Sequence, residues 1–449
     1  MNVLIVCCLL ASHPGLKSGP MLGPVEAMEA TIWFQTTVSA RVQVKFWKKS
    51  NPDMTQQSEP MITDKSSFLT GSIVLTDLEP NTDYQYQLVI DGQVSETSYP
   101  TGFKTQKYWE WRDDPAAFTV AIGSCLYVND PPFDRPGPVY GSEVNFVDGI
   151  IGTKPNLMIW LGDNHYYREP EFYARGRMLY RFSRVRAVPE LQPLWAACSH
   201  IAIWDDHDYG PNDSDRSYRD KYHSLEMFKA FWPNPTFGLP DTPGVFTSFI
   251  YQDVDFILLD DRFHRAPDKD PDPNKDYLGP EQLRWLKDRL LASHGSFKIV
   301  ALGNQVLNYR SQNESYAHYR GEFQQFRTWL DASGVNGVIF LSGDRHFTEL
   351  TKIDRVGLYP LYEYTSSPLT SGTYSTLSEE LQSPLRVPGT LVHKERNFGT
   401  LSFSGPYGDR TLILRCHSTD GKVLWEHRIH QEELKIPNPS SLIQYEQTP

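Results

Sequence analysis

The chain has 449 residues, and 39% of them are hydrophobic, which is enough to fill the cores of two or three domains. Its formal net charge of −12 argues against a nucleic-acid partner, because binding to a phosphate backbone needs a basic face. The five cysteines show no pairing pattern, so a disulfide framework is not indicated.

The first 19 residues are a candidate signal segment or tail. Residues 3–11 are apolar, but this run is shorter than the roughly 20 residues that a membrane-spanning helix needs. The run is long enough for the apolar part of a secretion signal, although no Lys or Arg precedes it. We expect a secreted or periplasmic protein without a transmembrane segment. The alternative for these residues is a plain first strand or a disordered tail.

Residues 20–106 are predicted to form a small all-β domain. Strand-like composition recurs over residues 30–35, 40–47, 72–75, 83–90 and 101–105. Turn signals, such as Pro80-Asn81 and Asp91-Gly92, separate these runs. Residues 78–86 resemble the turn and tyrosine of a fibronectin type III or immunoglobulin-like sandwich. Such a domain is more often a scaffold or an interaction domain than a catalyst.

Residues 107–115 are a predicted linker, and residues 116–435 are a predicted second domain. Apolar strands there alternate with helical stretches, which favours an α/β or α+β fold. The predicted helices span residues 144–151, 172–186, 222–231, 279–292 and 322–332. Further strands are predicted at residues 249–260, 298–302, 400–404, 410–415 and 423–429.

Four polar clusters each follow an apolar, strand-like run. The clusters are Cys125, Asp163, Asp205-Asp206-His207, and Asp344 with His346. Ligands in open α/β sheets bind beyond the carboxyl ends of the strands, so we expect these clusters to converge. Thiolates, carboxylates and imidazoles are metal ligands, and two metal ions can activate a water for hydrolysis. The sequence therefore predicts a metal-dependent hydrolase.

Each cluster suits a particular place in a two-metal site. Asp163 suits the bridging position, since Gly162 allows a sharp turn at the strand end. Asp205 and Asp206 are adjacent, so only one of them is expected to reach a given metal. Asn212 could add a neutral amide oxygen.

In an extended segment, Asp344 and His346 would face one side, leaving Arg345 on the other unless the backbone turns. Six more arginines lie close together along the chain, namely Arg168, Arg175, Arg177, Arg181, Arg184 and Arg186. They are either the solvated face of a helix or contacts for phosphate.

In combination, four short motifs resemble the alkaline phosphatase D family, the PhoD-type metallophosphoesterases. The motifs are Gly-Ser-Cys at 123–125, Leu-Gly-Asp at 161–163, Trp-Asp-Asp-His-Asp at 204–208 and Ser-Gly-Asp-Arg-His at 342–346. The resemblance covers most of the chain. It implies an N-terminal β-sandwich followed by a metallophosphatase-like β-sandwich flanked by helices. It also implies hydrolysis of phosphate esters outside the cytoplasm, at a centre of ferric iron and calcium.

The resemblance also implies roles for individual residues. Cys125 would bind iron as a thiolate and Asp163 would bridge the metals. The remaining ligands would be Asp344, His346, one of the two aspartates at 205 and 206, and Asn212. His207 would be a ligand, a proton donor to the leaving group, or a partner that holds a carboxylate. Arg345 is a candidate phosphate contact.

A tyrosine is expected as an iron ligand before residues 189–191, but Val185 stands at the expected place. Tyr180 is the nearest candidate, and Tyr166 and Tyr167 are alternatives.

Two other functions fit the same residues. One is a phosphodiesterase that acts on phospholipid head groups or on a polymer, with the same site and different pocket walls. Candidates for such walls are Tyr127, Tyr140, Tyr166, Tyr209 and Phe263. The other is a surface binding protein whose β-sandwich carries the function, with a metal site that is purely structural.

Overall fold

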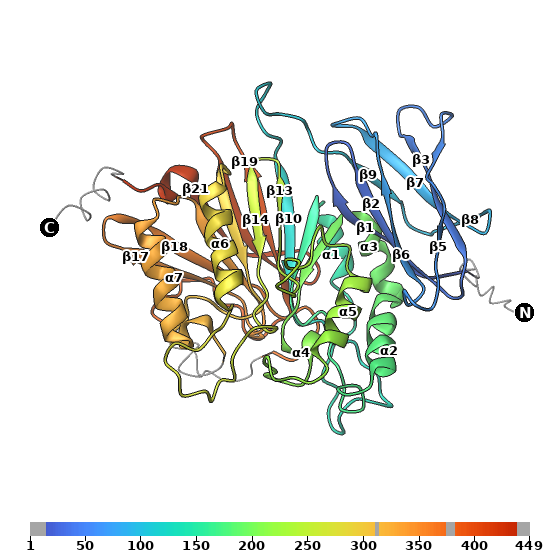
Figure 1. Ribbon diagram of the computed structural model, residues 1–449. Helices are drawn as coiled ribbons and strands as arrows, with labels where there is room; N and C mark the ends of the chain where they lie inside the picture. Colours follow the sequence, from blue (N-terminus) through green and yellow to red (C-terminus); the bar gives the residue numbers. More distant parts are fainter. Residues whose placement is uncertain (1–14, 310–313, 374–381, 438–449) are drawn as a thin grey trace, which may run out of the picture.

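The computed structural model describes residues 15–309, 314–373 and 382–437 (Figure 1). Two small sheets form an N-terminal unit, and two six-stranded sheets form the remainder. Within the described ranges, no helix is long and apolar enough to cross a membrane. The apolar run at residues 3–11, with Cys7 and Cys8, lies outside the described residues.

The N-terminal unit consists of two sheets around a shared core. One sheet has the order β1 (Leu16–Val25), β2 (Ala30–Thr36) and β6 (Thr70–Leu75). The other has the order β4 (Gln56–Gln57), β3 (Arg41–Lys48), β7 (Asp83–Ile90) and β8 (Gln93–Ser95), with β5 (Met61–Ile62) beside β3 and β9 (Gly102–Lys104) beside β7. Alternate side chains point inward, so Ile32 and Phe34 share one core with Val44 and Tyr86.

The predicted strands of this unit are present, but strand β1 was missed. Its sequence holds two Gly-Pro pairs and has no regular alternation, and its pairing with β2 shifts register. Since β1 begins at Leu16, residues 16–19 belong to the sandwich and not to the predicted tail. In the predicted turn, the Tyr84 hydroxyl accepts a hydrogen bond from the Glu79 N–H at 2.9 Å, as in the tyrosine corner of immunoglobulin-like folds.

The second unit stacks two mixed sheets. The first has the order β12 (Ser199–Ile203), β11 (Leu157–Leu161), β10 (Phe118–Gly123), β19 (Asn397–Ser404), β20 (Thr411–Ser418) and β21 (Val423–His430). The second has the order β13 (Thr247–Tyr251), β14 (Val254–Leu258), β15 (Phe297–Ala301), β16 (Val338–Ser342), β18 (Leu358–Thr365) and β17 (Glu349–Arg355). Strands β10 to β12 run parallel, as do β14 to β16, so each set of carboxyl ends meets at one edge.

The main core lies between the two sheets. The Phe403 ring of the first sheet lies 5.6 Å from the Phe297 ring and 6.4 Å from the Phe256 ring of the second. Helices α6 (Pro280–Ala292) and α7 (Arg320–Ala332) cover the second sheet. The first sheet is covered by α1 (Val147–Gly152), α2 (Arg175–Arg186), α3 (Gln192–Ala197) and α5 (Lys221–Phe231), while α4 (Asp206–Tyr209) follows β12 directly.

The predicted helices are present, with two corrections among the other elements. Residues 249–260 were predicted as one strand, but they fold as the hairpin of β13 and β14, with Gln252 at φ +51° in the turn. Strands β17 and β18 and the short helices α3 and α4 were not predicted. Helices α3 and α4 are short and β17 lies at the sheet edge, where the apolar pattern is weak. Strand β18 lies inside the sheet, but Pro360 and Glu363 interrupt its apolar run.

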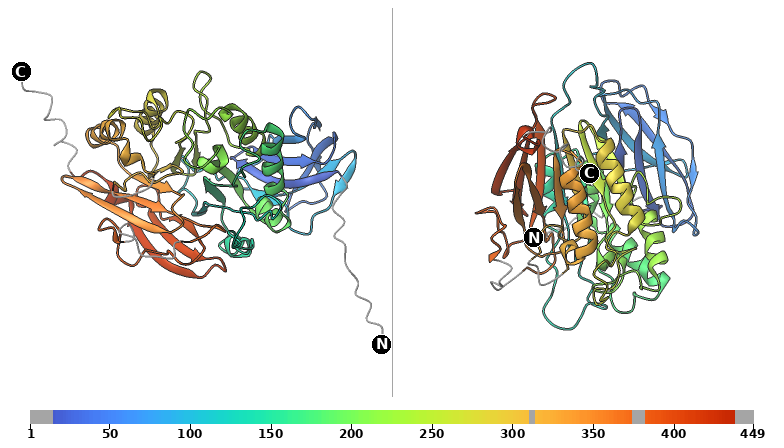
Figure 2. Two further views of the ribbon diagram at one scale, coloured as in Figure 1. Left: turned by 90° about the horizontal axis from the view of Figure 1, so that it is seen from below. Right: turned by 60° about the vertical axis from the view of Figure 1, so that its left-hand side comes forward.

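The N-terminal sandwich packs on the helices that cover the first sheet (Figures 1 and 2). Trp33 of β2 is buried there, and its indole N–H donates to the Ala230 carbonyl of α5 at 2.8 Å. The Ser18 hydroxyl donates to the Arg186 carbonyl at 2.6 Å, and the Ser183 hydroxyl donates to Gln35 at 2.9 Å. The contact therefore resembles a domain core more than a loose linkage.

We expect Trp33→Ala to lower the free energy of unfolding by about 3–5 kcal/mol, the usual cost of deleting a buried aromatic side chain. Urea unfolding followed by circular dichroism measures the loss. Trp111→Ala is the matched control, because the Trp111 side chain is 98% exposed. Equal unfolding midpoints for the two variants would contradict the proposed packing.

Candidate metal centre

The strand ends bring most of the predicted ligands together. Cys125, Asp163, Asp206 and Asp344 follow the carboxyl ends of β10, β11, β12 and β16. The Cys125 thiol lies 3.6 Å from Asp163 Oδ2. The backbone N–H of His207 lies 3.3 Å from Asp163 Oδ1 and 2.9 Å from Asp206 Oδ1. The site therefore spans both sheets.

Among the described residues, three groups of side chains have donor atoms within 4.8 Å of one another. They are Cys125, Asp163 and His346; Asp163, Asp206 and His207; and Asp206, Asp213 and Glu314. The first two groups share Asp163, which is the geometry that a bridging ligand requires. Asp213 was not predicted, although it stands next to the predicted Asn212.

The first group offers sulfur, nitrogen and oxygen donors. The Tyr166 hydroxyl lies 3.5 Å from His346 Nε2 and contacts the Cys125 thiol. Tyr180, the nearest candidate for the tyrosine ligand in the sequence, does not join this group. Its hydroxyl instead donates to Asp130 at 2.9 Å. Tyr167 packs on His165 and Phe182 behind the site. Of the three tyrosines predicted as candidates, Tyr166 is therefore the one beside the cluster. The Tyr140 hydroxyl, which was not among those candidates, also lies 3.2 Å from His346 Nδ1.

The third group is the poorest candidate for a metal. The Glu314 carboxylate lies 2.5 Å from Arg262 and 2.5 Å from Arg265, and both guanidinium groups are buried. A carboxylate already paired with two cations has little negative charge to offer a third. The first two groups are therefore the better pair of metal positions.

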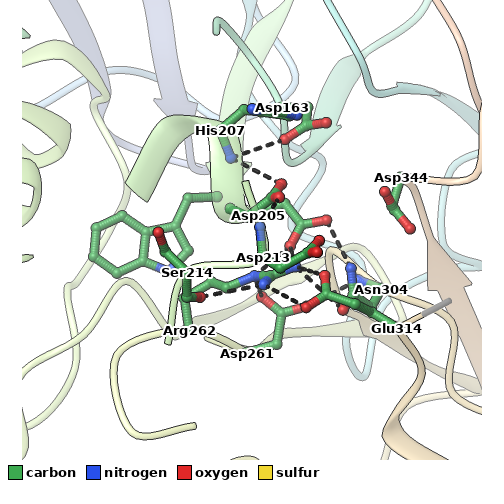
Figure 3. Close-up of polar contacts among 12 residues, drawn as sticks. Asp163, Asp205, His207, Asp213, Ser214, Asp261, Arg262, Asn304, Glu314 and Asp344 are labelled. Carbon is green, nitrogen blue, oxygen red and sulfur yellow. Dashed lines mark hydrogen bonds and ion pairs between the residues drawn. The ribbon is translucent and has the colours of Figure 1, made fainter. Parts of the chain in front are cut away.

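Asp205 contacts Arg262 and Asn304 (Figure 3). Its carboxylate accepts from Arg262 Nε at 2.6 Å and from the Asn304 amide at 2.8 Å, and it is fully buried. Asp205, predicted as a metal ligand, is therefore outside the three groups that could hold a metal, whereas Asp206 belongs to two of them. Arg262 and Asn304 were missed, although they follow strands β14 and β15 in the same way that the predicted ligands follow theirs.

The backbone at the strand ends is turned sharply. Cys125, Asp163, Asp344 and His346 have φ values of +59°, +52°, +63° and +54°. Left-handed backbone is costly for residues with a Cβ and recurs at tight turns and at functional sites. The extended conformation predicted for Asp344 and His346 is therefore wrong.

As a result of this turn, Arg345 lines the same cleft as Asp344 and His346. The cleft has a volume of about 380 Å³ and is also lined by Asp206, His207, Asn212 and Asp213. Within it, Arg345 Nη1 lies 3.2 Å from Asp344 Oδ2. An arginine beside the candidate ligands is well placed to contact an anionic substrate.

Burial and like charge dominate the electrostatics of the cluster. Burial, together with the nearby Asp206, holds the pKa of Asp163 well above its usual range. Burial raises the pKa of the Cys125 thiol to about 11 and lowers the pKa values of His207 and His346. Burial also acts to raise the pKa of Asp206, but His207, Arg262 and a backbone N–H bring it to about 2. Crowded carboxylates of this kind call for cations.

Asp208 ties two of the ligand-bearing loops together from behind. Its Oδ1 accepts the backbone N–H of Asn164 at 2.9 Å, and its Oδ2 accepts that of Asp205 at 3.1 Å. These amides adjoin Asp163 and Asp206, so one buried carboxylate fixes both strand ends. Such supporting partners hold metal ligands in place.

The six arginines are neither a solvated helix face nor a phosphate cluster. Arg181 is buried and pairs with Glu171 at 2.9 Å, and Arg186 is buried with its guanidinium 3.7 Å from the Trp232 ring centre. Arg175, Arg177 and Arg184 pair with Glu226, Glu171 and Asp130. Only Arg168 lines a cavity near the site, and it pairs with Asp134.

Comparison with known proteins identifies the family of the chain. Residues 143–398 match the PhoD-like phosphatase family, and residues 13–107 match a domain of unknown function, DUF7800. Alkaline phosphatase D of Bacillus subtilis (strain 168) is 24% identical over 310 residues, which cover 60% of this chain and 52% of that protein. The chain thus spans about half the length of this curated relative.

Two solved structures have a similar fold. A structure of PhoD matches with a TM-score of 0.74 and 15% identity, over 93% of this chain and 92% of that one. The purple acid phosphatase PPD1 from yellow lupin seeds matches with a TM-score of 0.63 and 14% identity, over 92% and 74%. These matches confirm the predicted metallophosphatase-like fold. The family match confirms the resemblance of the four motifs to the PhoD-type enzymes, which are phosphoric ester hydrolases. The chain belongs to the PhoD-like phosphatase family.

Proposed function

We propose that the protein hydrolyses phosphate esters at a two-metal centre, as an alkaline phosphatase D-like enzyme. The observation that carries this proposal is the pair of donor groups that share Asp163. The cleft beside them supports catalysis over a purely structural metal, because a structural site is closed by protein ligands. This counts against the alternative of a surface binding protein.

The donor atoms fit two different kinds of metal. Cys125, Tyr166 and His346 offer a thiolate, a phenolate and an imidazole, which suit a transition metal such as ferric iron. Asp206, with the nearby Asn212 and Asp213, offers oxygen donors, which suit calcium. When bound, the metals would polarise the phosphoryl group and lower the pKa of a water.

The remaining residues act on the substrate or hold the ligands. In this proposal, Arg345 donates hydrogen bonds to the phosphate oxygens from the wall of the cleft. Asp344 lies beside it and completes the ligand set. His207 is a metal ligand, because its ring nitrogen lies within 4.8 Å of carboxylate oxygens of both Asp163 and Asp206. A secreted or periplasmic location stays part of the proposal.

A phosphodiesterase acting on lipid or polymer esters remains the second candidate. It would use the same residues, and a larger cavity beside the metal cleft would give room for an additional organic group. Turnover of a phosphomonoester and of a phosphodiester with the same leaving group separates the two activities.

We expect the purified protein to contain iron and calcium by elemental analysis and to hydrolyse p-nitrophenyl phosphate, bis-p-nitrophenyl phosphate, or both. Asp163→Ala should lose metal and more than ~100-fold in turnover, since even supporting partners of metal ligands contribute 10–100-fold. Asp288→Ala is the control, because Asp288 is exposed on α6. Well-folded protein that binds no metal and hydrolyses neither ester, even when supplied with both ions, would refute the proposal.

The two adjacent aspartates should respond differently to substitution. Asp205→Ala leaves the buried Arg262 without its closest partner, so the metal-free protein should lose about 3–5 kcal/mol of unfolding free energy. Asp206→Ala should cost less stability and remove more of the bound metal. Urea unfolding of the metal-free variants measures the loss of stability, and elemental analysis of the variants as purified measures the loss of bound metal. A reversed order would show that Asp205 is the ligand.

His207→Asn should lower metal content and turnover together, each by roughly 10–100-fold, if the imidazole is a ligand. The comparison substrates are p-nitrophenyl phosphate and an alkyl phosphate, whose leaving group needs a proton. Full metal content with a loss confined to the alkyl phosphate would instead identify His207 as the proton donor.

A further inference from the structure

A second cavity, larger than the metal cleft, opens directly beside it. Its volume is about 650 Å³, which is within the usual range for a site that holds a small organic ligand. Tyr140, His207 and Asn212 line both the cavity and the cleft, so the two spaces meet at the candidate metal centre. A group attached to phosphate at the metals would therefore extend into this cavity.

The cavity walls near the candidate metal centre are aromatic. Tyr127, Tyr140, Tyr166 and Phe172 line it. The Tyr127 ring centre is 4.8 Å from that of Tyr140 and 5.1 Å from that of Tyr166, and Tyr166 packs on His207 at 4.1 Å. Tyr140 is 43% exposed, so part of its ring is free to contact a ligand. Aromatic walls favour a planar ring, which can stack on them or meet them edge to face.

The outer wall is a proline-rich loop, residues 130–140, which is pinned at its base. The Asn129 amide donates to the Gly141 carbonyl at 2.9 Å and accepts the Gly141 N–H at 3.1 Å. The Ser142 N–H donates to the Thr370 carbonyl at 2.8 Å. These bonds between protein groups hold both ends of the loop, and a wall that the protein itself orders lowers the entropic cost of binding a ligand.

The charged groups of the cavity wall neutralise one another. Four charged side chains line it, and they form two ion pairs: Arg168 with Asp134 at 2.7 Å, and Arg135 with Glu169 at 2.7 Å. The Arg168 guanidinium also lies 3.9 Å from the Tyr127 ring centre. A second phosphate on the ligand would have to break one of these pairs, so the wall disfavours polyanions.

We propose that this cavity binds the organic group of the phosphate ester, and that this group is a planar ring system without a further anionic group. The inference rests on the proposed function, because it takes phosphate to bind at the metals. It selects aryl and similar ring-bearing esters over small alkyl esters. It also selects them over nucleoside diphosphates, triphosphates and other substrates with several phosphates.

Binding of phosphonates to the metal-loaded protein tests the proposal without turnover. Isothermal titration calorimetry at an alkaline pH, where both ligands are dianions, compares methylphosphonate with benzylphosphonate. We expect benzylphosphonate to bind roughly tenfold more tightly, because its ring buries apolar area against aromatic walls. A bisphosphonate in which one benzene ring carries two CH2–phosphonate groups should bind no more tightly than benzylphosphonate.

Two variants connect the effect to this cavity. Phe172→Ala removes one aromatic wall and should shrink the preference for benzylphosphonate, with thermal unfolding as a check that the variant folds. Val139→Lys adds a cation to the lining at a side chain that is 79% exposed, and it should make the bisphosphonate the tighter ligand. Val356→Lys is the control, since Val356 is fully exposed in the turn between β17 and β18.

The outcomes separate this inference from the proposed function. Equal affinities for methylphosphonate and benzylphosphonate, or a bisphosphonate that binds more tightly to the unaltered protein, overturn the cavity assignment alone. If neither phosphonate competes with inorganic phosphate, the phosphate site at the metals is wrong and both proposals fall.

Discussion

Negative charge concentrated at one edge of two stacked sheets is the constraint on which the site depends. Asp163, Asp206 and Asp208 are buried within a few ångströms of one another, and burial acts to raise the pKa of each of them. Bringing such carboxylates out of water is unfavourable unless cations or N–H donors face them. Backbone N–H groups at the strand ends donate to these carboxylates. The carboxylate oxygens of Asp163 and Asp206 that face the cleft would be stabilised by bound cations.

The carboxylates divide into two layers with different tasks. Asp205 and Asp208 lie behind the site, where Arg262, Asn304 and backbone N–H groups satisfy them. Asp163 and Asp206 lie in front and join the groups that could hold metal. Asp205 and Asp208 hold the turns at the strand ends in place, and those turns set the direction of the Asp163 and Asp206 side chains. Substitution of Asp205 or Asp208 would therefore lower the stability of the protein and also disturb the geometry of the candidate ligands.

The N-terminal sandwich contributes to this arrangement indirectly. The residues that line the metal cleft and the neighbouring cavity all come from positions after 126. The sandwich instead buries Trp33 against helix α5 and bonds to Arg186 at the end of α2. These helices cover the outer face of the sheet that carries Cys125, Asp163 and Asp206. The sandwich therefore supports the site from outside the cleft and the cavity.

The sequence by itself determined the central strands, the long helices and most of the cluster, because buried parallel strands are continuous apolar runs and their ends carry the ligands. Only the tertiary structure placed Asp206, and not Asp205, among the groups that could hold a metal, and placed Tyr166 rather than Tyr180 beside them. It also placed Arg345 in the cleft. A local pattern gives the position of a residue along a strand. The direction of its side chain depends on left-handed turns and on partners such as Arg262, which are distant in sequence and meet only when the two sheets pack.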